Sequence, residues 1–166
     1  MLDHPKPIPV VWTQDVQRGD VVLFHFPSPA EPGPVLPRPC LVLDRTTTGG
    51  DVRLTLAPGK TATGTVRTSP HVSLKAPAEV LAAGLHVPVR FDLGMALTVS
   101  TRNASFANDM ATGTPVLGPL TGASKEQMFR VLARLQAKRD MAEMRIRARS
   151  NCLDAPARFA SRLTLP

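Results

Sequence analysis

The amino-acid sequence predicts a mainly β protein with a C-terminal α-helix, folded as a small barrel or strongly bent sheet. Three observations support this fold class. Proline supplies 17 of the 166 residues, about twice its usual frequency, and it is excluded from helix interiors and central strands. Short apolar runs recur every ~8–15 residues with turn residues between them, as in small barrels. One amphipathic helical stripe occurs, late in the chain.

Residues 1–17 are proline-rich and aperiodic and are expected to form an extended lead-in. Within it, residues 10–13 are expected to form a first short strand. Arg18-Gly19-Asp20 is a turn signal, and the apolar run 21–26 predicts a strand. Residues 27–37 contain five prolines and are expected to form an exposed loop.

The middle of the chain alternates between strand and turn patterns. Residues 40–44 predict a buried strand and 47–50 a turn, and in 51–56 every second residue is apolar, as in a half-buried strand. Residues 57–69 are expected to form a loop leading into a short strand, and 77–84 a helical turn ended by Gly84. The remaining predicted strands are 71–74, 87–93, 96–100 and 114–117.

The helix is predicted from a capping box, Ser124 with Gln127, followed by an apolar face at helical spacing. That face consists of Met128, Val131, Leu132 and Leu135. The apolar pattern weakens past Lys138, so the helix is expected to project or fray towards Arg149. The resulting organisation is a lead-in at 1–17, one domain at 18–136, and a basic, mobile extension at 137–166.

Charge is concentrated in the C-terminal quarter. Residues 1–123 carry ten Lys/Arg and nine Asp/Glu, a net of +1, whereas residues 124–166 carry ten and four, a net of +6. The basic residues of the helix could attract a phosphate backbone, or simply form a solvated helix face. These residues are Arg130, Arg134, Lys138, Arg145 and Arg149.

Several classes of protein are disfavoured. The N-terminus has acid and proline where a signal peptide has a basic end and an apolar run, so a cytoplasmic location is expected. Two cysteines 112 residues apart form neither a disulfide framework nor a zinc cluster, and no metal or other cofactor is expected. With one Trp and no Tyr, base stacking on a row of aromatic residues has little support.

The order of several motifs resembles the PemK/MazF toxin family. These motifs are Arg18-Gly19-Asp20-Val21-Val22-Leu23, a Gly/Pro loop with an acidic residue, Arg38-Pro39-Cys40-Leu41-Val42-Leu43, and a closing strand at 116–121 before the helix. The likeness covers about residues 18–140. It implies an SH3-like barrel, a homodimer, and metal-independent cleavage of single-stranded RNA by a toxin that an antitoxin protein neutralises, with the antitoxin lying along the 27–37 loop.

The resemblance also suggests catalytic residues. Arg38 occupies the position of the family's Arg before Pro, and an arginine fork binds phosphate and stabilises charge developing on phosphorus. Pro39 restricts Arg38 to extended backbone geometry. The family commonly has a Thr or Ser in a Pro-x-Thr pattern after the third strand; here Lys60 holds that position and Thr61 follows. Lys60 could bind phosphate, Thr61 could replace the missing hydroxyl, or activity could be lost.

Two further candidates for substrate binding come from the same region. Glu31 lies in the proline-rich loop, where family members often carry an acid, although a solvated loop charge explains it as well. His25 lies between Phe24 and Phe26, and it is expected to be exposed if both rings point into the core. An ordinary surface histidine is the alternative. His71 and His86 have no partner at a recognisable spacing.

Three functions remain open at this point. The first is a toxin-like endoribonuclease that uses Arg38 with Lys60 or Thr61. The second is a catalytically degenerate barrel that binds nucleic acid or a protein through its groove and basic tail. The third is an accessory protein without a nucleic-acid role.

Overall fold

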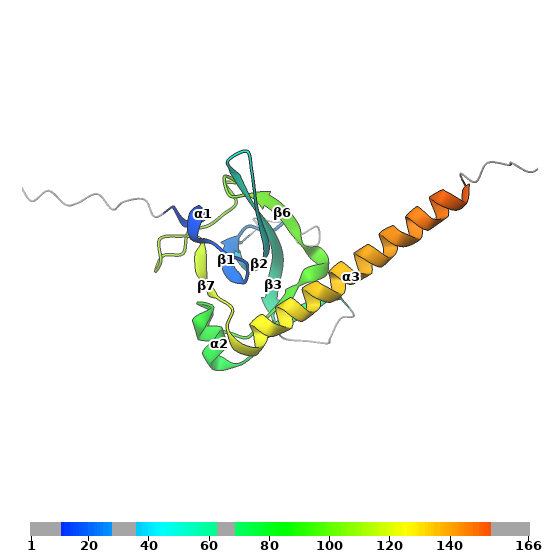
Figure 1. The fold of residues 1–166 in the computed structure, drawn as a ribbon. Coiled ribbons are helices and arrows are strands. Elements are labelled where there is room, and N and C mark those ends of the chain that lie inside the picture. The colour runs from blue at the N-terminus through cyan, green and yellow to red at the C-terminus, as the bar shows by residue number, and fades with distance from the viewer. Residues whose placement is uncertain (1–10, 28–35, 63–68, 154–166) are drawn as a thin grey trace, which may run out of the picture. The chain divides into compact units, whose positions relative to one another are not determined.

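The structure is a computed structural model that describes residues 11–27, 36–62 and 69–153. Within these ranges a seven-stranded antiparallel sheet curls into a half-barrel (Figure 1). Its order is β4-β5-β3-β2-β1-β7, and β6 also pairs with β3. The predicted mainly β fold class is confirmed at this level. The strands are β1 (Asp20–Phe24), β2 (Arg38–Thr48), β3 (Asp51–Thr61), β4 (His71–Leu74), β5 (Val89–Asp92), β6 (Leu97–Ser100) and β7 (Val116–Pro119).

The hairpin of β2 and β3 organises the sheet. Gly49 and Gly50 join the two strands and have φ values of 57° and 80°, which suits the left-handed backbone of a two-residue hairpin turn. Along its other edge, β3 pairs first with β6, at residues 53–56, and then with β5, at residues 59–61. The alternation predicted for 51–56 is confirmed, because Leu54 and Leu56 are fully buried.

The prediction that a loop begins at residue 57 is wrong, because β3 continues to Thr61. Pro58 and Gly59 are residues that disfavour a strand. Strand β3 nevertheless continues through both, with Pro58 paired with Cys40 and Gly59 with Phe91. Residues 63–68 lie outside the described ranges.

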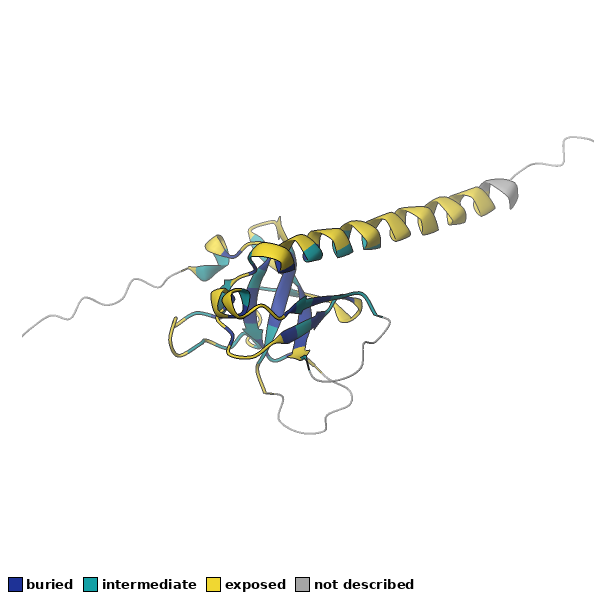
Figure 2. Ribbon diagram, turned by 90° about the horizontal axis from the view of Figure 1, so that it is seen from below, coloured by how far each residue is buried: buried dark blue, intermediate teal, exposed yellow. Residues whose placement is uncertain are grey.

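Both faces of the sheet carry buried residues. One face carries a cluster with three phenylalanines at its centre, in which Phe24 contacts Phe26 and Phe106 at ring-centroid distances of 6.4 and 4.9 Å. Cys40, Val42, Leu54 and Leu56 belong to the same cluster. Residues one position away in each strand face the other side, where Val21 and Leu41 are also fully buried. Figure 2 shows these buried strands in dark blue.

The lead-in contains a short helix where a strand was predicted. Helix α1 (Trp12–Asp15) closes its turn with a hydrogen bond from Val16 N–H to the Trp12 carbonyl at 3.0 Å. The Trp12 ring packs on Phe106 with centroids 5.0 Å apart, and Val16 is buried. Tertiary packing of one aromatic ring therefore outweighs the weak local strand preference.

Helices α2 (Pro77–Ala82) and α3 (Gly122–Leu153) meet where α3 begins. The Glu79 carboxylate of α2 accepts the Ala123 N–H at 2.9 Å, the Ser124 N–H at 3.3 Å and the Ser124 hydroxyl. These hydrogen bonds, led by that of the Ser124 hydroxyl, hold the pKa of Glu79 below its usual value. A carboxylate at a helix N-terminus also satisfies N–H groups that lack partners within the helix.

The predicted capping box is wrong for this reason. Helix α3 starts two residues before Ser124, and the cap comes from Glu79, 45 residues away. Gln127 does not complete a box; its side-chain oxygen accepts the Ser73 N–H at 3.2 Å instead. Met128 is fully buried, as its place in the apolar face predicts.

The chain divides into two compact units, residues 1–131 and 132–166. The first unit holds the sheet and the first turns of α3. In the second unit, the described side chains of α3 are mostly exposed (Figure 2). Helix α3 runs to Leu153, so the first part of the predicted 137–166 extension is helical. Among the described helices, none is both long and apolar enough to cross a membrane.

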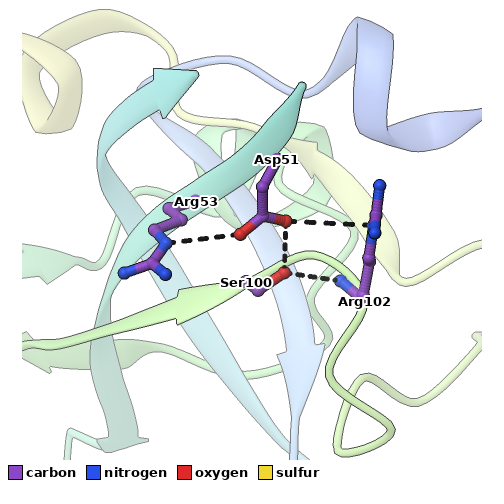
Figure 3. A network of polar contacts seen from close by, with 4 residues as sticks. All are labelled: Asp51, Arg53, Ser100 and Arg102. Carbon is purple, nitrogen blue, oxygen red and sulfur yellow. Dashed lines mark hydrogen bonds and ion pairs between the residues drawn. The ribbon is translucent and has the colours of Figure 1, made fainter. Parts of the chain in front are cut away.

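A network of polar side chains links β3 to β6 at the hairpin end of β3 (Figure 3). Asp51 accepts the Ser100 hydroxyl at 2.6 Å and lies 3.3 Å from Arg53 and 4.0 Å from Arg102. The Ser100 hydrogen bond, aided by the two guanidinium groups, holds the pKa of Asp51 below its usual value. This network joins β6 to β3. It lies ten residues along β3 from Thr61, about 33 Å of extended strand.

Candidate functional site

A pocket of about 680 Å³ opens at the opposite end of β3 from the Asp51 network. Its size is within the range of small-molecule sites, about 300–1,000 Å³. Segments that are distant in the sequence contribute to it: Leu23 of β1, the start of β2, the end of β3, the stretch from Gly84 to Val89, and the chain around Asp109 and Leu117. The lining residues with polar or charged side chains are Arg38, Lys60, Thr61, His86 and Asp109.

Gly59 allows the strands around this pocket to approach one another. A Cβ atom at this position would lie 2.6 Å from the Pro39 carbonyl oxygen, 2.8 Å from Val89 Cγ1 and 3.0 Å from Phe91 Cε1. The first of these atoms belongs to the backbone and cannot rotate away. A residue without a side chain is therefore needed where β2 and β5 close around the end of β3.

Arg38 is the first residue of β2, and the structure places it in the pocket lining as a half-buried side chain. It pairs with Phe24 of β1, whose ring is anchored in the core. Pro39 follows, pairs with Leu23, and also lines the pocket. Pairing with β1, whose residues are largely buried, thus fixes the position of the Arg38 backbone.

Lys60 and Thr61 also line the pocket, so the structure brings together the three predicted catalytic residues. Both are exposed, and they sit on β3 rather than on the predicted loop. Lys60 pairs with Arg90 and Thr61 with Val89 of β5. Strand pairing therefore fixes their positions beside Arg38, so no loop shift is needed to bring Thr61 to the site.

Two lining residues were missed by the sequence analysis, His86 and Asp109. The Asp109 carboxylate accepts the N–H groups of Ala111 and Thr112 at 3.1 and 3.0 Å. These bonds shape the turn that leads into β7. His86 lies in the turn between α2 and β5. Neither residue has a local pattern that signals its role, because only the tertiary fold brings them to Arg38.

Cys40 lies close behind this site but is not a nucleophile. Burial raises the pKa of its thiol to about 12, and this outweighs the lowering effects of the Arg38 charge and the Gly59 backbone. A thiol reacts as its thiolate. Cys40 is fully buried in the aromatic cluster, which agrees with its predicted place in the core.

The other predicted binding residues are placed elsewhere. His25 is half-buried, and its backbone N–H donates to the Ser105 carbonyl at 2.9 Å. It is not among the described residues that line the pocket. Phe24 and Phe26 are buried as the prediction required, but His25 is less exposed than expected. Glu31 lies outside the described residues.

The predicted cations of α3 fall in both units. Arg130 is exposed in the first unit and lies 3.9 Å from Glu126, one helical turn away. Arg134 and Lys138 are exposed in the second unit. Arg134, Lys138, Arg145 and Arg149 lie within about 60° of one another around the helix, given its 100° per residue. The two acidic residues of this stretch, Asp140 and Glu143, lie outside that sector.

No protein-family model matches the chain, and no curated protein matches it. Within the described ranges, the structure has no group of three or more His, Cys, Asp or Glu side chains placed to hold a metal ion. The chemistry available in the pocket is that of the residues that line it. It presents two cations, a hydroxyl, an imidazole and a carboxylate beside apolar walls.

Proposed function

We propose that this chain is a metal-independent endoribonuclease that cleaves single-stranded RNA, with an SH3-like barrel of the PemK/MazF type. The observation that carries the proposal is the convergence of Arg38, Lys60 and Thr61 on one pocket. The family resemblance independently points to Arg38, and to the family's hydroxyl position, which Lys60 occupies here with Thr61 next to it. As a family-like toxin, the protein would act as a homodimer in the cytoplasm, and an antitoxin would neutralise it.

The reaction needs charge stabilisation at phosphorus. Attack of a ribose 2′-oxygen on the adjacent phosphate builds negative charge on the non-bridging oxygens. The planar Arg38 guanidinium can bind two of these oxygens at once, and the Lys60 ammonium adds a second positive charge. Two cations in a partly enclosed pocket can thus do the work that a metal ion does elsewhere. The Thr61 hydroxyl can donate to the same phosphate.

The remaining walls suit a nucleotide rather than a bare phosphate. Leu36, Leu85, Val87 and Leu117 line the pocket beside the two cations. A ligand that fills it therefore combines an anionic part with an apolar part. A nucleobase next to its own phosphate meets this description. Single strands fit better than duplexes because their bases are free to turn into a pocket.

A nucleic-acid-binding module is the second candidate. Four cations of α3 share one sector without an acidic neighbour in it, which favours contact with a phosphate backbone. In this case Lys60 replaces a catalytic hydroxyl, and the pocket binds without cleaving. Such binding would weaken steeply with salt, because each phosphate contact releases counterions.

The deciding experiment incubates the whole 166-residue chain with mixed-sequence single-stranded RNA in EDTA. We expect products with a 2′,3′-cyclic phosphate and a 5′-hydroxyl. A 2′-deoxy nucleotide at the cleaved position should block the reaction, because it lacks the attacking oxygen. If RNA stays intact in EDTA and in Mg²⁺ while it binds in a salt-dependent manner, the second candidate replaces the first.

A further inference from the structure

The turn that carries His86 is anchored at both ends. On one side, Leu85 is buried and its N–H donates to the Val80 carbonyl at 3.0 Å. On the other side, the Pro88 carbonyl accepts the Ala62 N–H at 3.0 Å. His86 is thus held between a helix and the end of β3.

A close backbone approach holds the same turn against β7. Gly84 ends α2 with a φ of 70°, and a Cβ atom there would lie 2.5 Å from the Leu117 carbonyl oxygen. Leu117 is itself part of the pocket lining. The position of His86 relative to Lys60 and Thr61 therefore follows from backbone hydrogen bonds and packing, although its side chain is exposed.

Cleavage by the 2′-oxygen requires a group that accepts its proton, and the described lining residues offer few choices. The Arg38 and Lys60 side chains carry hydrogen-bond donors and no acceptor. The Asp109 carboxylate already accepts two backbone N–H groups. An imidazole exchanges its proton near neutral pH, which suits a general base.

We infer that His86 is the general base that takes the 2′-hydroxyl proton in this pocket. The inference rests on the proposed function and adds a catalytic residue to it. The imidazole nitrogen accepts the proton as the 2′-oxygen forms its bond to phosphorus. The bond from phosphorus to the 5′-oxygen breaks, and its electron pair stays on that oxygen. The leaving 5′-oxygen takes a proton from the Lys60 ammonium, and both side chains return to their starting state by exchange with water.

The charged groups that face this base from the pocket are Arg38, Lys60 and Asp109. Because a base accepts a proton only in its unprotonated form, the rate should fall as the pH is lowered. This acid limb is the signature that a purely structural role would not produce.

The test compares wild type with His86→Asn and His86→Gln under single-turnover conditions in EDTA, from pH 5 to 9. His71→Asn is the matched control, because His71 lies on β4 and its ring nitrogen bonds the Ser69 carbonyl at 3.0 Å. Binding is measured separately with a 2′-O-methyl RNA, which cannot be cleaved. Thermal unfolding of each variant verifies that it folds.

We expect both His86 variants to lose about 10²–10⁴-fold in rate at pH 7.5. They should also lose the acid limb, while affinity for the 2′-O-methyl RNA changes less than about threefold and His71→Asn behaves as wild type. Variants that keep the wild-type rate and pH profile would overturn the inference and leave the proposed function intact. A loss of rate that is matched by a loss of affinity would overturn it too. An inactive wild type would overturn both the inference and the proposed function.

Discussion

Replacing Arg38 with alanine is expected to lower the rate of RNA cleavage by at least about 10²–10³-fold, the usual cost of removing one donor that stabilises developing charge. The side chain is half-buried at the start of a strand whose core contacts come from later residues. The melting temperature should therefore stay within about 4 °C of wild type. Rates measured with a fluorogenic single-stranded RNA, together with thermal unfolding, test both parts.

Arg102→Ala is the matched control for charge. Arg102 is 79% exposed and belongs to the network at the far end of β3, so its loss removes the same charge without touching the pocket. We expect Arg102→Ala to cleave RNA at the wild-type rate. In cells, expression of the wild-type chain should arrest growth, and Arg38→Ala should relieve the arrest. Equal loss of activity in both variants would show that net charge, not the Arg38 position, governs cleavage.

The second large effect is expected from Phe91→Ala, which should lower the free energy of unfolding by about 3–5 kcal/mol. Phe91 is fully buried on β5, where it pairs with Gly59 on one side and Val72 on the other. Its removal leaves a cavity that the strand pairs prevent from collapsing. Urea denaturation followed by the fluorescence of Trp12 measures the change.

Leu81→Ala provides the comparison for this experiment. Leu81 has a large apolar side chain too, but it is 70% exposed on α2, so its truncation should change the free energy by less than about 0.5 kcal/mol. Similar losses in the two variants would contradict a core packed around Gly59. Cleavage by folded Phe91→Ala should also fall, because β5 supports the strand that carries Lys60 and Thr61.

Elements with a strong local period were predictable from the sequence. The alternation of Val52, Leu54 and Leu56 identified a half-buried strand, and Gly84 identified the end of a helical turn with its positive φ. Arg18-Gly19-Asp20 is a turn in which Asp20 accepts the Gln17 N–H at 2.7 Å. In each case the cause is local, so a few residues suffice to recognise it.

Other elements depend on contacts between distant residues, and these were missed. Strand β3 continues through Pro58 and Gly59 because β2 and β5 pair with it there. Helix α1 forms where Trp12 packs on Phe106, which is distant in sequence. The cap of α3 comes from Glu79 on another helix. Local propensity cannot reveal a partner that only the folded chain supplies.

The same contrast between local patterns and distant contacts applies to the residues of the candidate site. Arg38, Lys60 and Thr61 were found because they stand in motifs that resemble a family, and they line one pocket. His86 and Asp109 have no such motif. Their places are set by the turn after α2 and by the turn before β7, whose positions the sequence pattern did not connect. The two phenylalanines beside His25 were correctly predicted to be buried. That pattern gave no information on where the pocket lies.

The central claim is that a phosphodiester of single-stranded RNA occupies the pocket beside Arg38. Titration of the ¹⁵N-labelled 166-residue chain with a 2′-O-methyl RNA, followed by NMR, tests it most directly. We predict saturable shifts of the amide signals of Arg38, Lys60, Thr61 and His86, with Asp51, Arg53 and Ser100 unchanged. Shifts confined to residues outside the pocket, or none at saturating RNA, would contradict the claim.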